Sequence, residues 1–454
     1  MGWIQLALGR QPPGNPGERR FVGIVRGAAT ALASRGLSVT VSFLIVPLTV
    51  GYLGGERYGA WIAISGFLTW FQLADFGLSK GLTNNLADAN ARGRPEVAQR
   101  YVATAFWLLV AAAAALGIGF VIASIWVDWS DVFNVHEQVA RAELPLAIAL
   151  AFTIFALGFP LSLVDTICTA NQEGAIANLW TSGANLVTLA CVVIVTKTQG
   201  GMPALVLAIA GARLVVLVAS AVWLFAKHRT YLATAWSRFD RGLARHLASD
   251  GAHFFVIQIA ALLLFSTDNF IIARVLGASS VTPYSVTWKL FSISQILASI
   301  AFTYLWPAYV DAAARGDVKW ISRTFRFTIL LVVGFSVVLS IVFVVFGKSI
   351  IRVWAGAVAV PPGGLLVWMA AWSVIYAFMS SQACILNATK HLRGQMIYSI
   401  VAALVNIGLS VWWAGSYGIS GVIAATVISF LVFAVVPCSL ETLFVFRELH
   451  RRTH

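Results

Sequence analysis

Charged residues are scarce in this 454-residue sequence: Asp, Glu, Lys and Arg make up 11% of it, against about 25% in an average soluble domain. A soluble chain of this length needs a charged surface that so few ionisable residues do not supply. Disorder is excluded as well, because the sequence holds 29 Phe and 17 Trp within a 59% hydrophobic composition. The composition therefore predicts a protein that crosses a membrane many times.

Cysteines and catalytic or cofactor motifs are also sparse. The four cysteines lie within or at the edge of apolar runs, and no close Cys–Cys or Cys–His spacing indicates a metal site. The net charge of +13 is not gathered into a long basic soluble stretch, so no nucleic-acid partner is expected. There is no phosphate-binding loop of an ATP-driven pump. We predict buried free thiols, no metal and no cofactor.

Apolar runs long enough to cross a bilayer divide the whole chain. A hydrocarbon core of ~30 Å takes about 20 helical residues, and twelve segments meet this length. They are 27–52, 58–83, 102–126, 144–169, 175–196, 203–226, 252–273, 282–306, 327–347, 364–388, 396–415 and 419–440. The connections between them are too short for a soluble catalytic domain. The sequence thus predicts an all-α polytopic membrane protein that is not an enzyme.

The basic residues indicate how the chain is oriented. If the N-terminus is cytoplasmic, the cytoplasmic segments hold 21 of the 31 Lys and Arg residues and the external segments hold six. Cytoplasmic loops of membrane proteins carry such an excess of basic residues. We therefore expect both termini in the cytoplasm, with four cations left inside the spans.

The two halves of the sequence repeat one another weakly and in the same order. Leu53-Gly54 matches Leu276-Gly277 at an offset of 223, and Asp88–Gly93 matches Asp311–Gly316 at the same offset, with five identities in six. We predict two pseudo-symmetric six-helix lobes, 1–227 and 251–454, with a substrate site between them. The segment 228–250 has separate apolar and basic faces and is expected to form an amphipathic cytoplasmic linker, a helix in the membrane interface.

Seven charged residues lie within the predicted spans, where a charge costs a few kcal/mol or more. The cations are Arg35, Lys80, Arg213 and Lys289, and the carboxylates are Asp75, Asp165 and Asp268. Charges at this depth usually face a bundle interior or a wet cavity. We expect the cations to bind a phosphate or diphosphate in a central cavity. We expect the carboxylates to couple transport to a proton or sodium gradient.

Local structural roles stay open for four of these charges. Lys80 and Arg35 lie near the ends of their spans, where long side chains can snorkel to the interface. Asp165 follows Pro160 and can be satisfied at a kink, or it can pair with Arg213 as a structural bridge. Aromatic and amide side chains in the spans suit sugar stacking and hydrogen bonding, although Trp and Tyr also anchor membrane interfaces; they include Trp288, Trp372, Gln382 and Asn406.

Three stretches resemble a known family. Pro47–Trp61 and Asp75–Leu82 are similar to the opening of bacterial polysaccharide and O-antigen flippases, of the multidrug/oligosaccharidyl-lipid/polysaccharide exporter superfamily. Ser266–Ile272, running into Leu276-Gly277, resembles the seventh span of that family. Asp75, Lys80 and Asp268 fall on these motifs, whereas the other four charges rest on their depth in the membrane alone.

The resemblance implies a function. Members of the family move an undecaprenyl-diphosphate-linked oligosaccharide across the bacterial inner membrane, through two lobes that alternate access to a basic cavity. A lipid-linked oligosaccharide and glycan polymerases are the partners it implies. The alternative is an ion-coupled multidrug or small-molecule exporter of the same superfamily. Its cationic substrates would favour a cavity dominated by carboxylates, whereas this sequence places four cations and three carboxylates in the spans.

Overall fold

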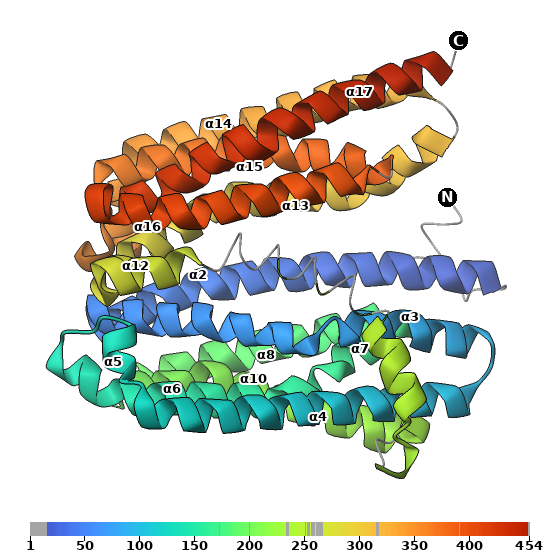
Figure 1. The fold of residues 1–454 in the computed structure, drawn as a ribbon, viewed down its shortest axis with the longest axis horizontal. Helices are drawn as coiled ribbons and strands as arrows, with labels where there is room; N and C mark the ends of the chain where they lie inside the picture. Colours follow the sequence, from blue (N-terminus) through green and yellow to red (C-terminus); the bar gives the residue numbers. More distant parts are fainter. Residues whose placement is uncertain are drawn as a thin grey trace. The chain divides into compact units, whose positions relative to one another are not determined.

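A computed structural model of the chain describes residues 16–171, 173–198, 200–232, 236–249, 251, 255, 259, 267–314, 317–389 and 391–452. In this part of the chain the regular structure is helical and contains no strand, as Figure 1 shows. Eight stretches of helix are long and apolar enough to cross a membrane. The chain is therefore an all-α, multi-pass membrane protein, as the composition predicts.

Two of the longest helical stretches each cover two predicted crossings. α2 (Pro16–Trp70) leaves helical geometry at Gly54, with φ 75° and ψ −172°. α16 (Leu392–Phe430) does so at Gly418, and η7 (Leu431–Val435) and α17 (Val436–Arg452) continue it. At 1.5 Å per residue each stretch is much longer than the ~30 Å core. If each of these two stretches crosses the membrane once on each side of its glycine, the eight apolar helical stretches give ten crossings.

Most of the remaining helices overlap predicted spans. In the first half they are α3 (Leu78–Ala91), α4 (Pro95–Trp126), the short α5 (Trp129–Val132), α6 (Gln138–Leu161), α7 (Leu163–Ala170), α8 (Gly174–Val195), α9 (Gly201–Val206), η2 (Leu207–Gly211), α10 (Ala212–Trp223) and η3 (Leu224–His228). In the second half they are α12 (Asp268–Leu276), α13 (Ala278–Ala314), α14 (Val318–Ala355), η6 (Ala357–Ala359) and α15 (Gly363–Ala388). The predicted span 282–306 falls on α13, and most of 252–273 lies outside the described residues. The count of twelve stays a prediction.

The chain folds as two compact units that exchange short segments of sequence. The first unit comprises Met1–Tyr52, Leu68–Trp129 and Ala142–Gln258, and the second comprises Leu53–Phe67, Ser130–Arg141 and Ile259–His454. Two pieces from the first half of the sequence thus pack with the second unit. The lobe boundaries at 227 and 251 stay predictions.

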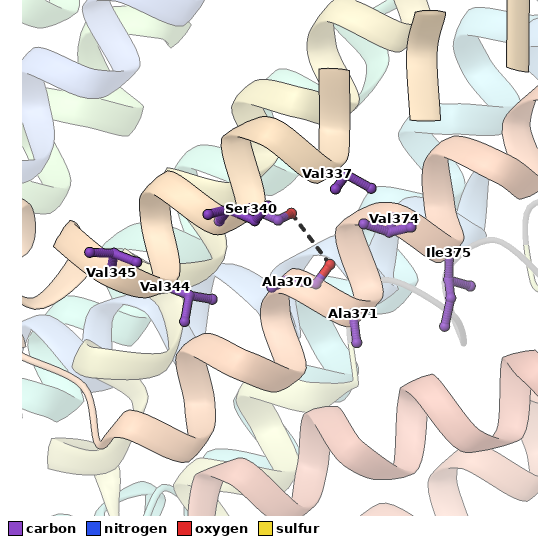
Figure 2. A pocket seen from close by; sticks show the side chains of 9 residues that line it. Val337, Ser340, Val344, Val345, Ala370, Ala371, Val374 and Ile375 are labelled. Atoms are coloured by element: carbon purple, nitrogen blue, oxygen red, sulfur yellow. Dashed lines mark hydrogen bonds between the residues drawn. The ribbon is translucent and has the colours of Figure 1, made fainter. Parts of the chain in front are cut away.

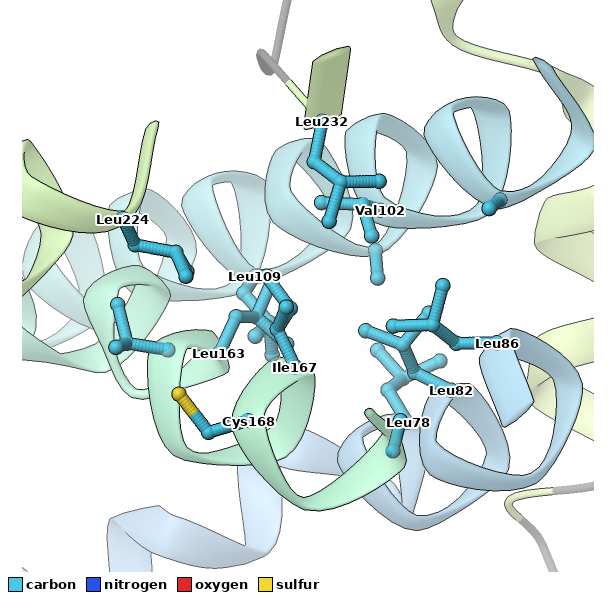
Figure 3. Close-up of a cluster of buried hydrophobic side chains, with 14 of the residues drawn as sticks. Leu78, Leu82, Leu86, Val102, Leu109, Leu163, Ile167, Cys168, Leu224 and Leu232 are labelled. Carbon is cyan, nitrogen blue, oxygen red and sulfur yellow. The ribbon is translucent and has the colours of Figure 1, made fainter. Parts of the chain in front are cut away.

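A leucine-rich core holds the first unit together near the start of α3. Leu78, Leu82 and Leu86 recur every four residues and form one buried face of that helix. They pack against Leu109 of α4 and Ile167 of α7 in the cluster that Figure 3 shows. All of these side chains are less than a tenth exposed. The predicted buried thiols are found at Cys168, Cys384 and Cys438, and Cys191 is half-buried.

The segment that joins the halves differs from its predicted shape. It contains 3-10 turns at Thr230–Leu232 and Trp236–Arg238 and a helix only over 241–249. The described residues of 228–250 therefore do not form one helix, and the cytoplasmic, interfacial placement of the linker stays a prediction. The reason is tertiary packing: Leu232 and Leu247 are fully buried in the core of the first unit. The ring of Trp236 meets Trp107 of α4 edge-on at 4.9 Å.

Candidate functional site

The seven predicted site charges differ in how deeply they are buried. Asp75 in the first unit and Asp268 in the second are buried, each 8% exposed. Lys289 is half-buried on α13. The others are exposed on the first unit, and they are Arg35 on α2, Lys80 on α3, Asp165 on α7 and Arg213 on α10. The two buried carboxylates need a physical explanation, because an unpaired buried charge is costly.

Asp75 lies at a break in the second predicted span. A 3-10 turn, η1 (Phe71–Asp75), is followed by Phe76 and Gly77 in the left-handed region, with φ 47° and 74°, and α3 starts at Leu78. Oδ1 of Asp75 accepts hydrogen bonds from the Ser79 backbone N–H at 3.1 Å and from its hydroxyl at 3.0 Å. The carboxylate thus caps the N-terminus of α3, where N–H groups lack partners and negative charge is favoured.

The break is also supported by contacts from a distant segment. A Cβ added at Gly77 would lie 2.1 Å from the carbonyl oxygen of Gly251, so the two backbones touch. The Phe76 ring packs on Phe255, with centroids 5.2 Å apart. The sequence predicts a span over 58–83, and the structure interrupts the α-helix of that span between Trp70 and Leu78. Neither the left-handed turn nor the contact with Gly251 is visible in the hydropathy that defines the span.

Asp268 is the first residue of α12, and its two carboxylate oxygens have different surroundings. Oδ2 accepts a hydrogen bond from the Tyr284 hydroxyl of α13, and Tyr284 is 2% exposed. Oδ1 is buried and has no hydrogen-bond partner among the described residues. The pair joins the two helices on either side of Gly277. A carboxylate with one oxygen hydrogen-bonded and the other without a partner among the described residues is suited to take up a proton or a small cation.

A row of aromatic rings extends from this carboxylate through the second unit. Tyr284 stacks on Trp288 at 6.3 Å, and Trp288 stacks on Trp372 of α15 at 6.2 Å. Trp372 then meets Phe430 of α16 edge-on at 4.9 Å. Trp372 is 2% exposed. This indole is packed inside its unit, so it does not offer a face to a sugar as the sequence suggests.

Two amides suggested for sugar binding are also interior to the second unit. Oδ1 of Asn406 accepts hydrogen bonds from the hydroxyls of Ser410, at 2.9 Å, and Thr426, at 3.2 Å. The bond from Thr426 joins the two parts of α16 across Gly418. Gln382 of α15 donates to the Ser439 hydroxyl of α17 at 2.7 Å. Both amides hold helices together, which their position in the sequence does not distinguish from substrate binding.

The first unit lacks one expected ion pair and contains an unexpected one. Among the described residues no salt bridge joins Asp165 to Arg213, so that alternative is not found. Instead Glu173, just before α8, forms an ion pair with Arg229 at 2.5 Å and a contact with His228 at 3.1 Å. The partners are 55 and 56 residues apart in sequence. Only the fold brings these side chains together.

The membrane-crossing helices are arranged as in solved structures of multi-pass membrane transporters. A solved structure described as the inward-facing conformation of a multidrug resistance MATE family transporter of the MOP superfamily matches with a TM-score of 0.76. It is 15% identical, and the match covers 94% of this chain and 100% of that one. A MOP superfamily transporter from Pyrococcus furiosus matches with a TM-score of 0.62 at 16% identity, over 99% of each chain. At these identities the likeness establishes the fold.

Sequence relatives define the family within that fold. The model of the polysaccharide biosynthesis protein family matches residues 24–312, and the chain belongs to this family. A putative O-antigen transporter of Salmonella typhi is 23% identical over 410 residues, which cover 89% of this chain and 92% of the relative. A putative O-antigen export protein of Yersinia pseudotuberculosis is 20% identical over 413 residues, with the same coverage. The predicted family resemblance is confirmed, and the chain is a transporter rather than an enzyme.

Proposed function

We propose that this transporter flips a polyprenyl-diphosphate-linked oligosaccharide across the bacterial cytoplasmic membrane for the export of cell-surface polysaccharide. The family match over residues 24–312 is the observation that carries this proposal, and the names of the relatives support it. Both termini would lie in the cytoplasm, where most of the basic residues are placed. Glycan polymerases would receive the flipped substrate.

In this proposal Asp268 couples transport to a proton or sodium gradient. Its Oδ1 is buried without a hydrogen-bond partner among the described residues, while Tyr284 holds Oδ2. A proton or sodium ion at Oδ1 would neutralise a buried charge whose burial costs several kcal/mol. Ion occupancy would thereby change the relative stability of the conformations that expose or bury this carboxylate, which is what coupling requires. Asp75 and Asp165 are the further candidates for this role.

The predicted cations would bind the diphosphate. Arg35, Lys80 and Arg213 are exposed and form no ion pair among the described residues, so their charges are available to a ligand. Arginine binds phosphate in a bidentate manner, and lysine binds it as a point charge. Lys289 of α13, half-buried five residues after Tyr284, is the fourth predicted cation.

Complementation of a flippase-deletion strain tests the proposal. Asp268→Asn is expected to lower surface polysaccharide at least tenfold and to remove the sensitivity of residual export to an ionophore. Membrane abundance should stay normal. The control is Asp88→Asn, which removes a carboxylate from an exposed ion pair with Arg92. Unchanged dependence on the gradient in Asp268→Asn would place ion coupling elsewhere.

The substrate is tested separately. Arg35→Ala and Lys289→Ala are expected to abolish polysaccharide export at normal abundance, because each removes a cation that is predicted to bind the diphosphate. Normal export by both variants would contradict that site. The same strains distinguish the alternative exporter of drugs, to which the fold likeness extends. If the wild-type chain raised drug resistance and failed to restore surface polysaccharide, the flippase proposal would be wrong.

A further inference from the structure

An apolar groove lies between α14 and α15 on the second unit. It has a volume of about 500 Å³ and is lined by nine residues. They are Val337, Ser340, Ile341, Val344, Val345, Ala370, Ala371, Val374 and Ile375. Figure 2 shows the lining side chains on the two neighbouring helices. The one hydroxyl in the lining, that of Ser340, donates to the Ala370 carbonyl oxygen at 3.5 Å. The lining of the groove is therefore hydrocarbon apart from this hydroxyl.

The groove exists because small residues meet on its floor. Ser340 is 4% exposed, and Ala370 and Ala371 face it from α15, so no large side chain fills the space. Ile341 and Val345 stand at the rim, 59% and 65% exposed. A single hydrocarbon chain lying between these walls would restore the packing that the small residues leave out.

One wall of the groove continues into two cations. Ile341, Val345, Lys348 and Arg352 follow one another at steps of four, three and four residues, so they form one stripe along α14. Lys348 and Arg352 are exposed and form no ion pair among the described residues. The stripe therefore changes from apolar to basic toward the C-terminal end of the helix, as an amphiphile with an anionic head requires.

We propose that this groove binds one acyl chain of an anionic phospholipid, whose phosphate contacts Lys348 and Arg352. Val337 and Lys348 are eleven residues apart on α14, which is about 16 Å of helix. Half the thickness of a ~30 Å hydrocarbon core is about the same length. A phosphate at Lys348 thus lets an acyl chain lie in the groove and end near the bilayer midplane. A polyprenyl chain is several times longer than one leaflet, so the groove matches it less well.

Native mass spectrometry of the full chain tests the headgroup contact. The protein would be released from nanodiscs of equal phosphatidylglycerol and phosphatidylcholine with a small fraction of undecaprenyl phosphate. We expect one retained phosphatidylglycerol. Lys348→Gln with Arg352→Gln should lower the preference for it by about 30-fold, since each basic residue near the surface adds about 1 kcal/mol. The matched control is Lys319→Gln with Arg323→Gln, which removes the same charge at the other end of α14.

A second variant tests the groove itself. Ala371→Leu places a larger side chain in the groove and is expected to reduce lipid retention, whereas Val338→Leu, on α14 outside the lining, should not. Three results would overturn the proposal. They are equal retention of the two phospholipids, equal loss in the charge control, and retention of undecaprenyl phosphate that Ala371→Leu abolishes.

Discussion

Two backbones in the second unit approach too closely to admit a side chain at one glycine of α2. Gly55 and Gly59 are four residues apart on one face of that helix and meet the start of α13. The Thr282 hydroxyl donates to the Gly55 carbonyl oxygen at 2.5 Å. A Cβ added at Gly59 would lie 1.8 Å from the carbonyl oxygen of Ala278. Small residues permit such close helix contacts in membranes.

Gly59→Ala is therefore expected to destabilise the second unit. A C···O contact is normally about 3.3–3.6 Å, so the helices must separate by roughly 1.5 Å. The blocking atom belongs to backbone and does not rotate away. Overpacking of this kind costs about 1–3 kcal/mol, and the Thr282 hydrogen bond adds about 0.6 kcal/mol. The higher helix propensity of alanine returns up to about 1 kcal/mol. The net loss is about 1–3 kcal/mol.

The matched control is Gly334→Ala in α14 of the same unit, where an added Cβ meets no atom within 4 Å. That variant is expected to be stabilised by about 0.5–1 kcal/mol. At about 2–4 °C per kcal/mol, the midpoints of thermal unfolding of the two purified variants should differ by roughly 3–16 °C. Equal midpoints would refute the close contact between α2 and α13.

Three further changes test other parts of the structure. Asp75→Ala should lower thermal stability by about 1 kcal/mol by uncapping α3, whereas Asp75→Asn, which keeps an acceptor oxygen, should lower it by half as much or less. The N–H groups of Leu243 and Gly242 hold the pKa of Asp240 below its ordinary value, so this carboxylate stabilises the fold above about pH 4 and stops doing so as the pH falls through the lowered pKa. Asp240→Asn should make acid unfolding less steep, measured by tryptophan fluorescence. Asn406→Leu loses two hydrogen bonds worth about 0.6 kcal/mol each and should shift the unfolding midpoint downward by a few degrees.

Turns between crossings are the part of the fold that the sequence predicts best. The repeat pairs Leu53-Gly54 with Leu276-Gly277, and both glycines adopt positive φ, 75° and 91°, with extended ψ. Residues other than glycine rarely adopt this backbone conformation. A repeated glycine at the end of an apolar run therefore marks a repeated turn. Crossing length and turn position both follow from local chemistry.

The broken span and the partners of the site charges do not follow from local chemistry. The left-handed Phe76 is a residue that turn patterns do not favour, and the break depends on contact with Gly251, more than 170 residues away. Tyr284 reaches Asp268 only because the chain reverses at Gly277. Depth in the membrane identified both buried carboxylates, but it also selected Arg35 and Asp165, which are exposed. The mean hydropathy of a span indicates that its residues lie within the membrane. It does not show which side of the helix packs against the rest of the protein.

The two buried carboxylates stand in different electrostatic surroundings, although family motifs cover both. Asp75 accepts N–H and O–H bonds at the start of α3, so a helix N-terminus already compensates its charge. Asp268 receives one neutral hydroxyl from Tyr284, and its other oxygen is unpartnered among the described residues. A cation would gain more at the carboxylate that is less compensated. We therefore propose that ion uptake is centred on Asp268 and that Asp75 maintains the broken span. Ion coupling would then belong to the second unit, and the first unit would use its carboxylate to maintain the broken span.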